Sequence, residues 1–297
     1  MILRAYILTF LIAINSIVCL AQDKFALFVG ISNYHAIDSN NEWNDIHGVN
    51  DVNILFPIFK TQGFQVVSLT DENATKKQII KELHALEDKV TKGSIVYIHF
   101  SAHGQPFQDF DGDEEDGWDE SIVPVDAKIE FVKGVYEGEN HITDDELLVH
   151  TNKLRKRMGP EGCLYVVVDA CHAGRTSRGG VRLENTIRGT KRGFSRDDSL
   201  YVAIKDAKTL YKISEVPNWA PITFLEACKN TQVNSEFLKE GFYYGPMSYY
   251  ISVVLKDVTI NNDISWVFNV KEMMKSDISL RRQNMVIETS KLEENGK

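Results

Sequence analysis

The sequence predicts an α/β fold with a mostly parallel central sheet and helices on both faces. Apolar, β-branched runs typical of buried strands alternate along the chain with amphipathic stretches typical of helices. This alternation produces strand–helix–strand units, which place successive strands parallel in one sheet. The composition, 43% hydrophobic and 25% charged over 297 residues, is that of an ordinary globular protein.

The amino-terminal residues have a different character. Residues 1–21 carry Arg4 as their one charge, an apolar stretch follows it, and Ala21 precedes polar residues. We interpret 1–21 as a secretory signal peptide, because the stretch is too short and wrongly flanked for a transmembrane anchor. A lipoprotein signal at Cys19 is the less favoured alternative, since the bulky Val18 precedes it. The sequence therefore predicts an exported protein, periplasmic or extracellular, without a stable membrane anchor.

Three strands and two helices are expected in the first hundred residues. The strands are apolar runs at 25–31, 64–69 and 95–100. A helix is expected at 52–60 despite Pro57, and another at 75–90, where Thr75 is suited to cap the first turn. Strands separated by helices in this way are typical of a doubly wound sheet.

The second half of the chain continues the alternation. We expect a helix at 144–158 capped by Thr143, a buried strand at 164–168 and another at 221–227. The remaining elements are a helix that starts within 245–248 and ends at 255, a helix at 266–274 and a last edge strand at 285–288.

Two reactive side chains follow the ends of two of these strands. The apolar run 164–168 leads to Cys171, and the run 95–100 leads to His103. Adjacent parallel strands lie about 4.8 Å apart and end at the same edge, so the imidazole can reach the thiol. An adjacent histidine converts a weakly nucleophilic thiol into a thiolate. The alternative is that Cys171 is only a small buried hydrophobic residue, but the pairing with His103 favours a nucleophile and its base.

The motifs around these two residues resemble those of the caspase-like cysteine peptidases, and most closely those of metacaspases. His103-Gly104 follows one strand, and Asp-Ala-Cys-His-Ala-Gly follows the other at 169–174, with Asp169 where animal caspases have glutamine. The resemblance runs from about Phe25 to the tail. It implies a caspase-like three-layer sandwich, with a large part at 22–174, a basic linker at 175–215 and a small part at 216–297.

The resemblance also assigns roles to individual residues. It implies that the backbone N–H groups of Cys171 and Gly104 hold the oxyanion, and that Asp51, Ser101 and Asp169 line the pocket for the residue before the cut bond. Two carboxylates in a partly dry pocket favour arginine or lysine, with bidentate geometry for arginine. The expected partner is therefore a protein or peptide with Arg or Lys before the cut bond.

Calcium is the one cofactor that the resemblance suggests, as an activator rather than a requirement. Asp119 lies in an acidic stretch, and Asp144 and Asp145 match a paired aspartate motif that binds calcium in metacaspases. The alternative is that these acids begin a helix capped by Thr143, where they favour the helix dipole. Arg178 stands where the family has a further acid, which weighs against calcium.

The linker after Cys171 is basic and rich in glycine. Between 175 and 196 there are seven basic residues and a single acid, Glu184, which indicates a mobile surface loop. The resemblance implies a segment where many caspase-like proteins cut themselves, and together with the tether to the nucleophile it predicts self-cleavage within 175–196, around Arg188-Gly-Thr-Lys191-Arg192. The competing interpretation is that the loop stays intact and covers the site.

The remaining cysteines and the net charge limit the partners further. Without the signal peptide the chain has Cys163, Cys171 and Cys228, and an odd number leaves at least one thiol free. A Cys163–Cys228 disulfide is the alternative to three free thiols. The formal charge of −9 argues against a nucleic-acid partner.

These observations predict a secreted cysteine endopeptidase with a Cys171/His103 dyad. His103 is preferred over His172 as the base, because adjacent residues of an extended segment point in opposite directions, and His99 is expected to be structural. Two alternatives remain open. One is a clostripain- or gingipain-type peptidase that also prefers basic residues, and the other is an inactive caspase-like binding scaffold.

Overall fold

A computed structural model describes residues 22–112, 114, 117–171, 186–190, 192–197, 201–202 and 208–291. The expected signal peptide and His172 lie outside these residues, as does much of the linker. Among the helices within this part of the chain, none has the length and apolar character needed to cross a membrane.

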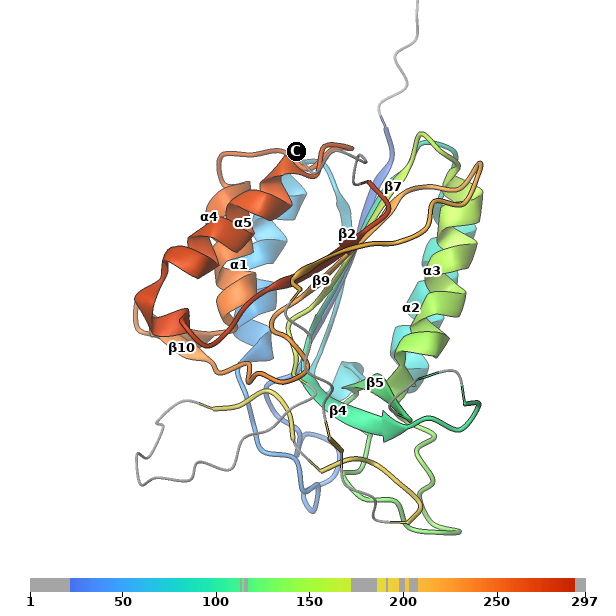
Figure 1. Cartoon of the computed structure of the whole chain (residues 1–297), viewed down its shortest axis with the longest axis vertical. Helices are drawn as coiled ribbons and strands as arrows, with labels where there is room; N and C mark the ends of the chain where they lie inside the picture. Colours follow the sequence, from blue (N-terminus) through green and yellow to red (C-terminus); the bar gives the residue numbers. More distant parts are fainter. Residues whose placement is uncertain are drawn as a thin grey trace, which may run out of the picture.

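A seven-stranded sheet forms the middle layer, in the order β2-β1-β3-β7-β9-β12-β8 (Figure 1). The strands, in that order, are Gln65–Thr70, Lys24–Gly30, Ile95–Ser101, Cys163–Val168, Ile222–Glu226, Val286–Thr289 and Leu210–Lys212. The first five are parallel, β12 is antiparallel to β9, and β8 is parallel to β12. The mostly parallel sheet is as predicted. The expectation that 285–288 is an edge strand is wrong, because the short β8 pairs beyond it.

Helices cover both faces of this sheet, which confirms the three-layer arrangement (Figure 1). One face carries α1 (Gly48–Thr61), α4 (Pro246–Leu255) and α5 (Ser265–Ser276), and the other carries α2 (Lys76–Lys89) and α3 (Asp144–Met158). Two short 3₁₀ helices are η1 (Asp71–Asn73) and η2 (Ile278–Leu280). Thr75 and Thr143 accept hydrogen bonds from Gln78 N and Glu146 N, both at 3.3 Å, and so cap α2 and α3 as predicted.

The side chains of β3 contribute to both hydrophobic cores, one on each face of the sheet. Its seven residues are all buried, and alternate side chains point to opposite faces. Val96, Ile98 and Phe100 pack in the core beneath α2 and α3, whereas Ile95 and Tyr97 pack beneath α1, α4 and α5. Each large apolar side chain contributes about 1.5–3 kcal/mol when fully buried. A strand that is apolar on both faces can therefore occupy only the middle of the sheet.

The start of α1 brings an acid to the carboxyl ends of the strands. This helix begins four residues before the predicted position, at Gly48. A Cβ on Gly48 would lie 2.2 Å from Ser101 O and 2.6 Å from Ile31 O, so only glycine allows the helix to start against the ends of β1 and β3. As a result Asp51, in the first turn of α1, lies beside the end of β3.

Smaller strands lie outside the main sheet. β4 (His103–Gln108), β5 (Trp118–Val123) and β6 (Ile142–Thr143) form an antiparallel sheet beyond the carboxyl ends, and β10 (Phe237–Lys239) pairs with β11 (Phe242–Tyr244). These strands were not expected from the sequence. The acidic stretch that contains Asp119 is in part a strand, because Trp118 to Glu120 belong to β5.

Candidate functional site

The carboxyl ends of β3 and β7 are adjacent and carry the two residues predicted to be reactive. The strands pair in parallel up to Phe100 and Val168. His103 lies at the start of β4, two residues after β3, and Cys171 lies three residues after β7. Both are almost completely buried, with 2% and 1% of their surface exposed. The structure therefore brings them to one edge of the sheet.

The imidazole of His103 is held in one orientation. Its Nε2 lies 2.8 Å from the carbonyl oxygen of Asn44, which can only accept, so Nε2 carries the proton and Nδ1 is the basic atom. The ring packs against both Tyr34 and Trp43, with centroids 4.8 Å away in each case. Nδ1 is buried and has no hydrogen-bond partner among the described residues. Burial lowers the pKa of His103 to about 4, so the ring is neutral at ordinary pH.

The three cysteines within the described residues form no disulfide. Cys171 Sγ donates to the carbonyl oxygen of Gln232 at 3.0 Å, and Cys228 Sγ lies 3.6 Å from the same oxygen. The hydrogen bond with Cys171, together with burial, raises the pKa of Cys228 well above its ordinary value. Cys163 packs in the core beneath α5. A Cys163–Cys228 disulfide is therefore ruled out, because the two thiols lie in different clusters.

Arg188, a residue of the linker, occupies the site. Its carbonyl oxygen accepts hydrogen bonds from Cys171 N at 2.8 Å and from Gly104 N at 3.3 Å. Its side chain has no exposed surface. The prediction of a surface loop is therefore wrong at Arg188, because four polar side chains at the sheet edge surround its guanidinium.

These four side chains, Asp51, Ser101, Asp169 and Glu236, form what we call the arginine pocket. Asp51 Oδ2 lies 2.6 Å from Arg188 NH1, and Glu236 Oε1 lies 3.0 Å from Nε and 2.9 Å from NH2. Ser101 Oγ accepts from NH1 at 2.6 Å and donates to Asp51. Burial opposes the charge on the guanidinium, but the carboxylates hold the pKa of Arg188 above its ordinary range.

Asp169 contributes to the pocket mainly as a support. It lies 3.7 Å from Arg188 NH1, while its oxygens accept from Ser248 N at 2.8 Å, Ser248 Oγ at 2.5 Å and Asn234 Nδ2 at 2.6 Å. His99 Nε2 lies 3.0 Å from Ser248 Oγ and His99 Nδ1 lies 3.0 Å from Tyr97 OH. The chain of hydrogen bonds ties β3 to α4 behind the pocket and gives His99 the structural role that was predicted.

Burial also shapes the acid–base behaviour of the pocket. Asp51 has no exposed surface, and this burial, with the charge of Asp169, raises its pKa to about 7, although Arg188 acts in the opposite direction. Asp51 further accepts a hydrogen bond from Gly245 N at 3.0 Å. A Cβ on Gly245 would lie 2.3 Å from Asp169 Oδ2, so a side chain there would fill the pocket.

The segment around Arg188 binds as an extended strand. Arg188 N donates to Asn234 O at 3.0 Å, and Glu236 N donates to Thr186 O at 2.9 Å, which pairs Ile187 with Ser235 in antiparallel fashion. On the other side of Arg188, Gly189 lies against the backbone of Cys171, and a Cβ there would be 1.8 Å from Cys171 O. The chain thus passes through the site as a peptide would.

Three contributors escaped the sequence analysis. Asn44 acts through its backbone carbonyl, which no residue type reveals. Glu236 directly precedes β10, in a stretch for which the sequence predicted no element, and nothing in the sequence marks it as a pocket residue. Asn234 orients Asp169 from the same segment. Each is brought to the pocket by contacts between the large and the small part, and these contacts depend on the fold.

The acids proposed for calcium form a separate cluster. Burial and repulsion from Asp144 and Asp145 raise the pKa of Asp119 to about 7, and burial with repulsion from Asp145 does the same for Asp144. Asp144 and Asp145 line a cavity of about 480 Å³ together with Glu226 and Glu288. Carboxylates that repel one another are the donors that a hard cation such as calcium prefers, so the residues fit such an ion. The alternative role is also present, since Thr143 caps α3.

A second group could also hold a metal ion. The ligand atoms of His84, Glu87 and His150 lie within 4.8 Å of one another between α2 and α3. In the structure Glu87 binds both imidazoles, at 3.3 and 2.6 Å, and Lys153 lies 3.8 Å from it. These contacts already engage the Glu87 carboxylate and join the two helices.

Comparison with known proteins bears on the whole arrangement. Residues 24–177 match the family model described as metacaspase, peptidase C14 domain. The chain is 27% identical over 266 residues to Metacaspase-1 of Mycosarcoma maydis. The aligned region covers 77% of this chain and 62% of that protein. It is 31% identical over 159 residues to Metacaspase-1 of Eremothecium gossypii, covering 51% and 32%. The chain thus spans less than two thirds of the length of these relatives.

The fold has a counterpart among solved structures. The protein GSU0716 of Geobacter sulfurreducens superposes with a TM-score of 0.59 at 18% sequence identity, over 92% of this chain and 95% of that chain. At this level of identity the similarity concerns the fold, and it confirms the predicted α/β architecture.

Proposed function

The chain belongs to the metacaspase family of peptidase C14 domains, and from this we propose that it is a cysteine endopeptidase that cleaves after arginine or lysine. One observation carries the proposal. Arg188 places its side chain among the carboxylates of the arginine pocket while its carbonyl oxygen accepts hydrogen bonds from Cys171 N and Gly104 N. An arginine bound in this way has the arrangement of a substrate whose carbonyl group awaits attack.

The proposed reaction uses the groups around that carbonyl. His103 Nδ1 takes the proton of Cys171 Sγ, and the thiolate attacks the carbonyl carbon of the arginine. The negative charge that develops on oxygen is stabilised by the N–H groups of Cys171 and Gly104. His103 then gives its proton to the leaving amine, and a thioester remains. Water, deprotonated by the same imidazole, hydrolyses the thioester and regenerates the thiol.

The pocket supports a preference for basic side chains. Asp51 and Glu236 approach the guanidinium from two sides, and Glu236 accepts from both Nε and NH2. A lysine ammonium would keep the charge but lose this forked geometry, so arginine should be the better substrate. Aspartate would be repelled by three buried carboxylates, so peptides with aspartate before the cut bond should not be cleaved.

The same observation supports self-processing between Arg188 and Gly189. This lies within the predicted cleavage region, and Gly189 is small enough to follow the cut bond beside Cys171. Tethering gives the arginine a high effective concentration at the pocket, which favours cleavage within one molecule. Cleavage would divide the chain into a larger amino-terminal and a smaller carboxyl-terminal fragment.

Two further properties belong to the proposal. Asp119, Asp144 and Asp145 would hold an activating calcium ion, which would neutralise their mutual repulsion. The apolar character of residues 1–21 supports export to the periplasm or the medium. The family match favours a metacaspase over a clostripain- or gingipain-type enzyme. An inactive scaffold would not require an arginine whose carbonyl group lies at Cys171, so the position of Arg188 favours an active enzyme.

The experiment compares four variants with the wild type, each incubated with calcium and with a chelator and then analysed by intact mass. We expect the wild type to yield two fragments cut after Arg188. Cys171→Ala, His103→Ala and Arg188→Gln should remain whole. Arg192→Gln is the matched control, because Arg192 is an exposed basic residue of the same linker, paired with Glu130, and its loss should leave cleavage unchanged.

The outcomes separate the parts of the proposal. Fragments from Cys171→Ala would mean that a contaminating protease made the cut. An uncut wild type that still hydrolyses arginine reporter peptides would remove self-processing and keep the peptidase. If the wild type stays uncut, hydrolyses no reporter and does not react with an iodoacetamide probe at Cys171, the inactive caspase-like scaffold would be the remaining interpretation.

A further inference from the structure

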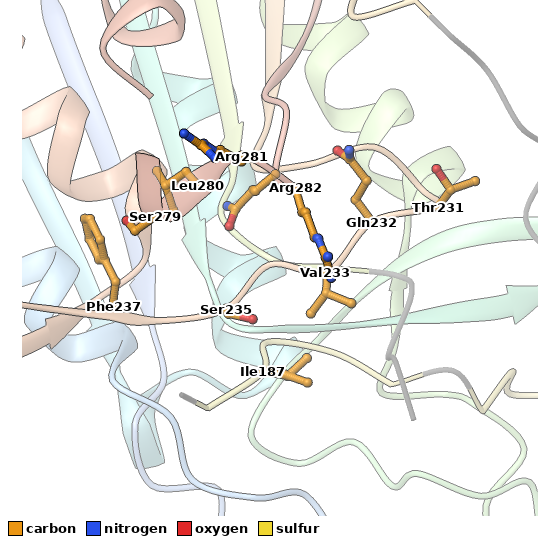
Figure 2. Close-up of a pocket in the computed structure, with 11 residues that line it drawn as sticks. Ile187, Thr231, Gln232, Val233, Ser235, Phe237, Ser279, Leu280, Arg281 and Arg282 are labelled. Atoms are coloured by element: carbon orange, nitrogen blue, oxygen red, sulfur yellow. The ribbon is translucent and has the colours of Figure 1, made fainter. Parts of the chain in front are cut away.

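Two histidines and a glutamate gather between α2 and α3, the two helices on one face of the sheet (Figure 1). His84 and Glu87 are three residues apart on α2 and share one side of that helix, and His150 contacts both from α3. We call these three residues the histidine cluster. The cluster is separate from the cavity of about 540 Å³ beside Ile187 that Figure 2 shows, because none of its residues lines that cavity.

The side chains of the histidine cluster converge through the atoms that bind metals. Both imidazoles turn Nδ1 towards the carboxylate of Glu87: His150 Nδ1 lies 2.6 Å from Oε1, and His84 Nδ1 lies 3.3 Å from Oε2. All three ligand atoms lie within 4.8 Å of one another. Because zinc–nitrogen distances are about 2.0–2.1 Å, the ligand atoms around a tetrahedral zinc ion lie about 3.3 Å apart. Small side-chain movements would therefore admit the ion.

The surroundings of the histidine cluster support its ligands and leave one side open. The side chains of His150 and Glu87 are 7% and 12% exposed, whereas that of His84 is 53% exposed. Buried leucines of both helices pack in one core beside the cluster: Leu83, Leu86, Leu147 and Leu154. The ligands thus have a rigid support. An ion can enter past His84 and keep a water molecule as its fourth ligand.

We propose that the histidine cluster binds one zinc ion, which joins α2 to α3. Two imidazole nitrogens and a carboxylate oxygen suit zinc, whereas calcium takes oxygen ligands only. The ion would bind the Nδ1 lone pairs and displace any proton that lies between them and Glu87. Lys153 opposes binding, since its ammonium lies 3.8 Å from Glu87 Oε2, but this side chain is 49% exposed and can turn into solvent.

The test measures zinc binding to the protein in a Cys171→Ala background, which removes the reactive thiol as a competing ligand. Calcium is kept in excess over zinc so that sites made of oxygen atoms are filled. We expect calorimetric titration to give one zinc ion per chain. At about one hundred times Kd, zinc should raise the melting temperature by about 5–10 °C, because only the folded chain brings the three ligands together.

Histidine variants identify the ligands. His84→Ala and His150→Ala should each weaken zinc binding by at least about tenfold. His84 is the safer of the two changes, because its side chain is half exposed and its loss leaves the core intact. His35→Ala is the matched control, since His35 is another exposed histidine that pairs with one acid, Asp45. Its affinity for zinc should equal that of the parent.

Lys153 provides a check in the opposite direction. Lys153→Met removes the ammonium that competes for Glu87 and should tighten zinc binding by about two- to fivefold. Lys156→Met changes an exposed lysine of the same helix and should leave the affinity unchanged. Equal affinities of these two variants would show that the ion does not bind at Glu87, which contradicts the proposal.

Other results would also overturn the zinc site. The proposal is wrong if the parent binds no zinc, or if His84→Ala and His150→Ala bind it as tightly as the parent does. A loss that His35→Ala shares equally would mean that zinc binds scattered surface histidines and not a defined site. None of these measurements uses peptidase activity, so such a failure would leave the proposed function unaffected.

Discussion

At the scale of single residues, one backbone carbonyl fixes the chemistry of the proposed site. Asn44 O accepts from His103 Nε2, and this leaves Nδ1 as the unprotonated atom of a ring whose pKa lies near 4. The imidazole therefore needs no carboxylate to hold its tautomer. Because any residue can provide a carbonyl group, the sequence at position 44 gives no indication of this role.

Asp51 makes the binding of arginine dependent on pH. Its pKa is raised to about 7, so it takes up a proton and loses its charge as the pH falls below 7, whereas His103 remains neutral. We expect KM for an arginine reporter to rise by at least about threefold between pH 8 and pH 6, with little change in kcat. Initial rates measured across this range give both constants.

Two variants check this assignment. Asp51→Asn should have a higher KM that no longer varies between pH 8 and pH 6. Glu236→Gln should also raise KM, because it removes the negative charge that accepts two hydrogen bonds from the guanidinium, but it should keep the pH dependence. A wild type with constant KM, or a pH-dependent Asp51→Asn, would contradict the role of Asp51.

At the scale of elements, β9 and β12 place two acids close together. Glu226 ends β9, and burial with repulsion from Glu288 and Asp144 raises its pKa to about 8. A raised pKa means that the folded state binds the proton more tightly than the unfolded chain does. The stability that this provides is present below the ordinary pKa of glutamate and is lost as the pH rises towards 8.

Glu226→Gln should therefore stabilise the protein at alkaline pH only. In a Cys171→Ala background with a chelator present, we expect its melting temperature to exceed that of the parent by about 2–4 °C at pH 8.5 and to equal it at pH 4. Glu272→Gln, which changes an exposed glutamate of α5, is the control and should have no effect at either pH. Equal melting curves at pH 8.5 would show that Glu226 is not held in a strained, charged state.

The elements also show where the sequence was informative. Long apolar runs and helices with threonine caps were predicted to within a few residues, because the residues that define them are close together in the sequence. β4, β5 and β8 were missed or misplaced, since they are short and contain glycine, proline or charged residues. Their strand structure depends on neighbours that are distant in sequence, such as Val123 opposite His103.

At the scale of the whole molecule, the predicted large and small parts share one sheet. β7 of the large part pairs with β9 of the small part over Leu164–Val168 and Ile222–Glu226. The core beneath α1, α4 and α5 contains side chains from both parts. The proposed cleavage after Arg188 would therefore cut one connection and leave the sheet and the core intact.

We expect the two fragments to remain associated after cleavage. On size-exclusion chromatography in native buffer, the cleaved protein should elute at the volume of the uncleaved Cys171→Ala protein. The fragments should separate only in denaturant, where the sheet is lost. Separation in native buffer would mean that the shared sheet does not hold the parts together.

The site was predicted in part, and the limits have a physical reason. Cys171, His103, Gly104, Asp51, Ser101 and Asp169 do gather at one edge, because each lies near the end of a strand or the start of a helix that the sequence reveals. Glu236 and the bound Arg188 were not predicted as pocket residues. Their place depends on how the linker and the small part fold back onto the sheet.

Arg188, which occupies the arginine pocket in the uncut chain, affects how inhibitors can bind there. A tether of sixteen residues separates Cys171 from Arg188, and a short tether gives a bound group a local concentration in the millimolar range. A drug-like molecule that mimics arginine must compete with this internal ligand in the uncut chain, but not once the segment has left the pocket. Compounds screened against the precursor would therefore look far weaker than against the cleaved form, and a screen should begin with the latter.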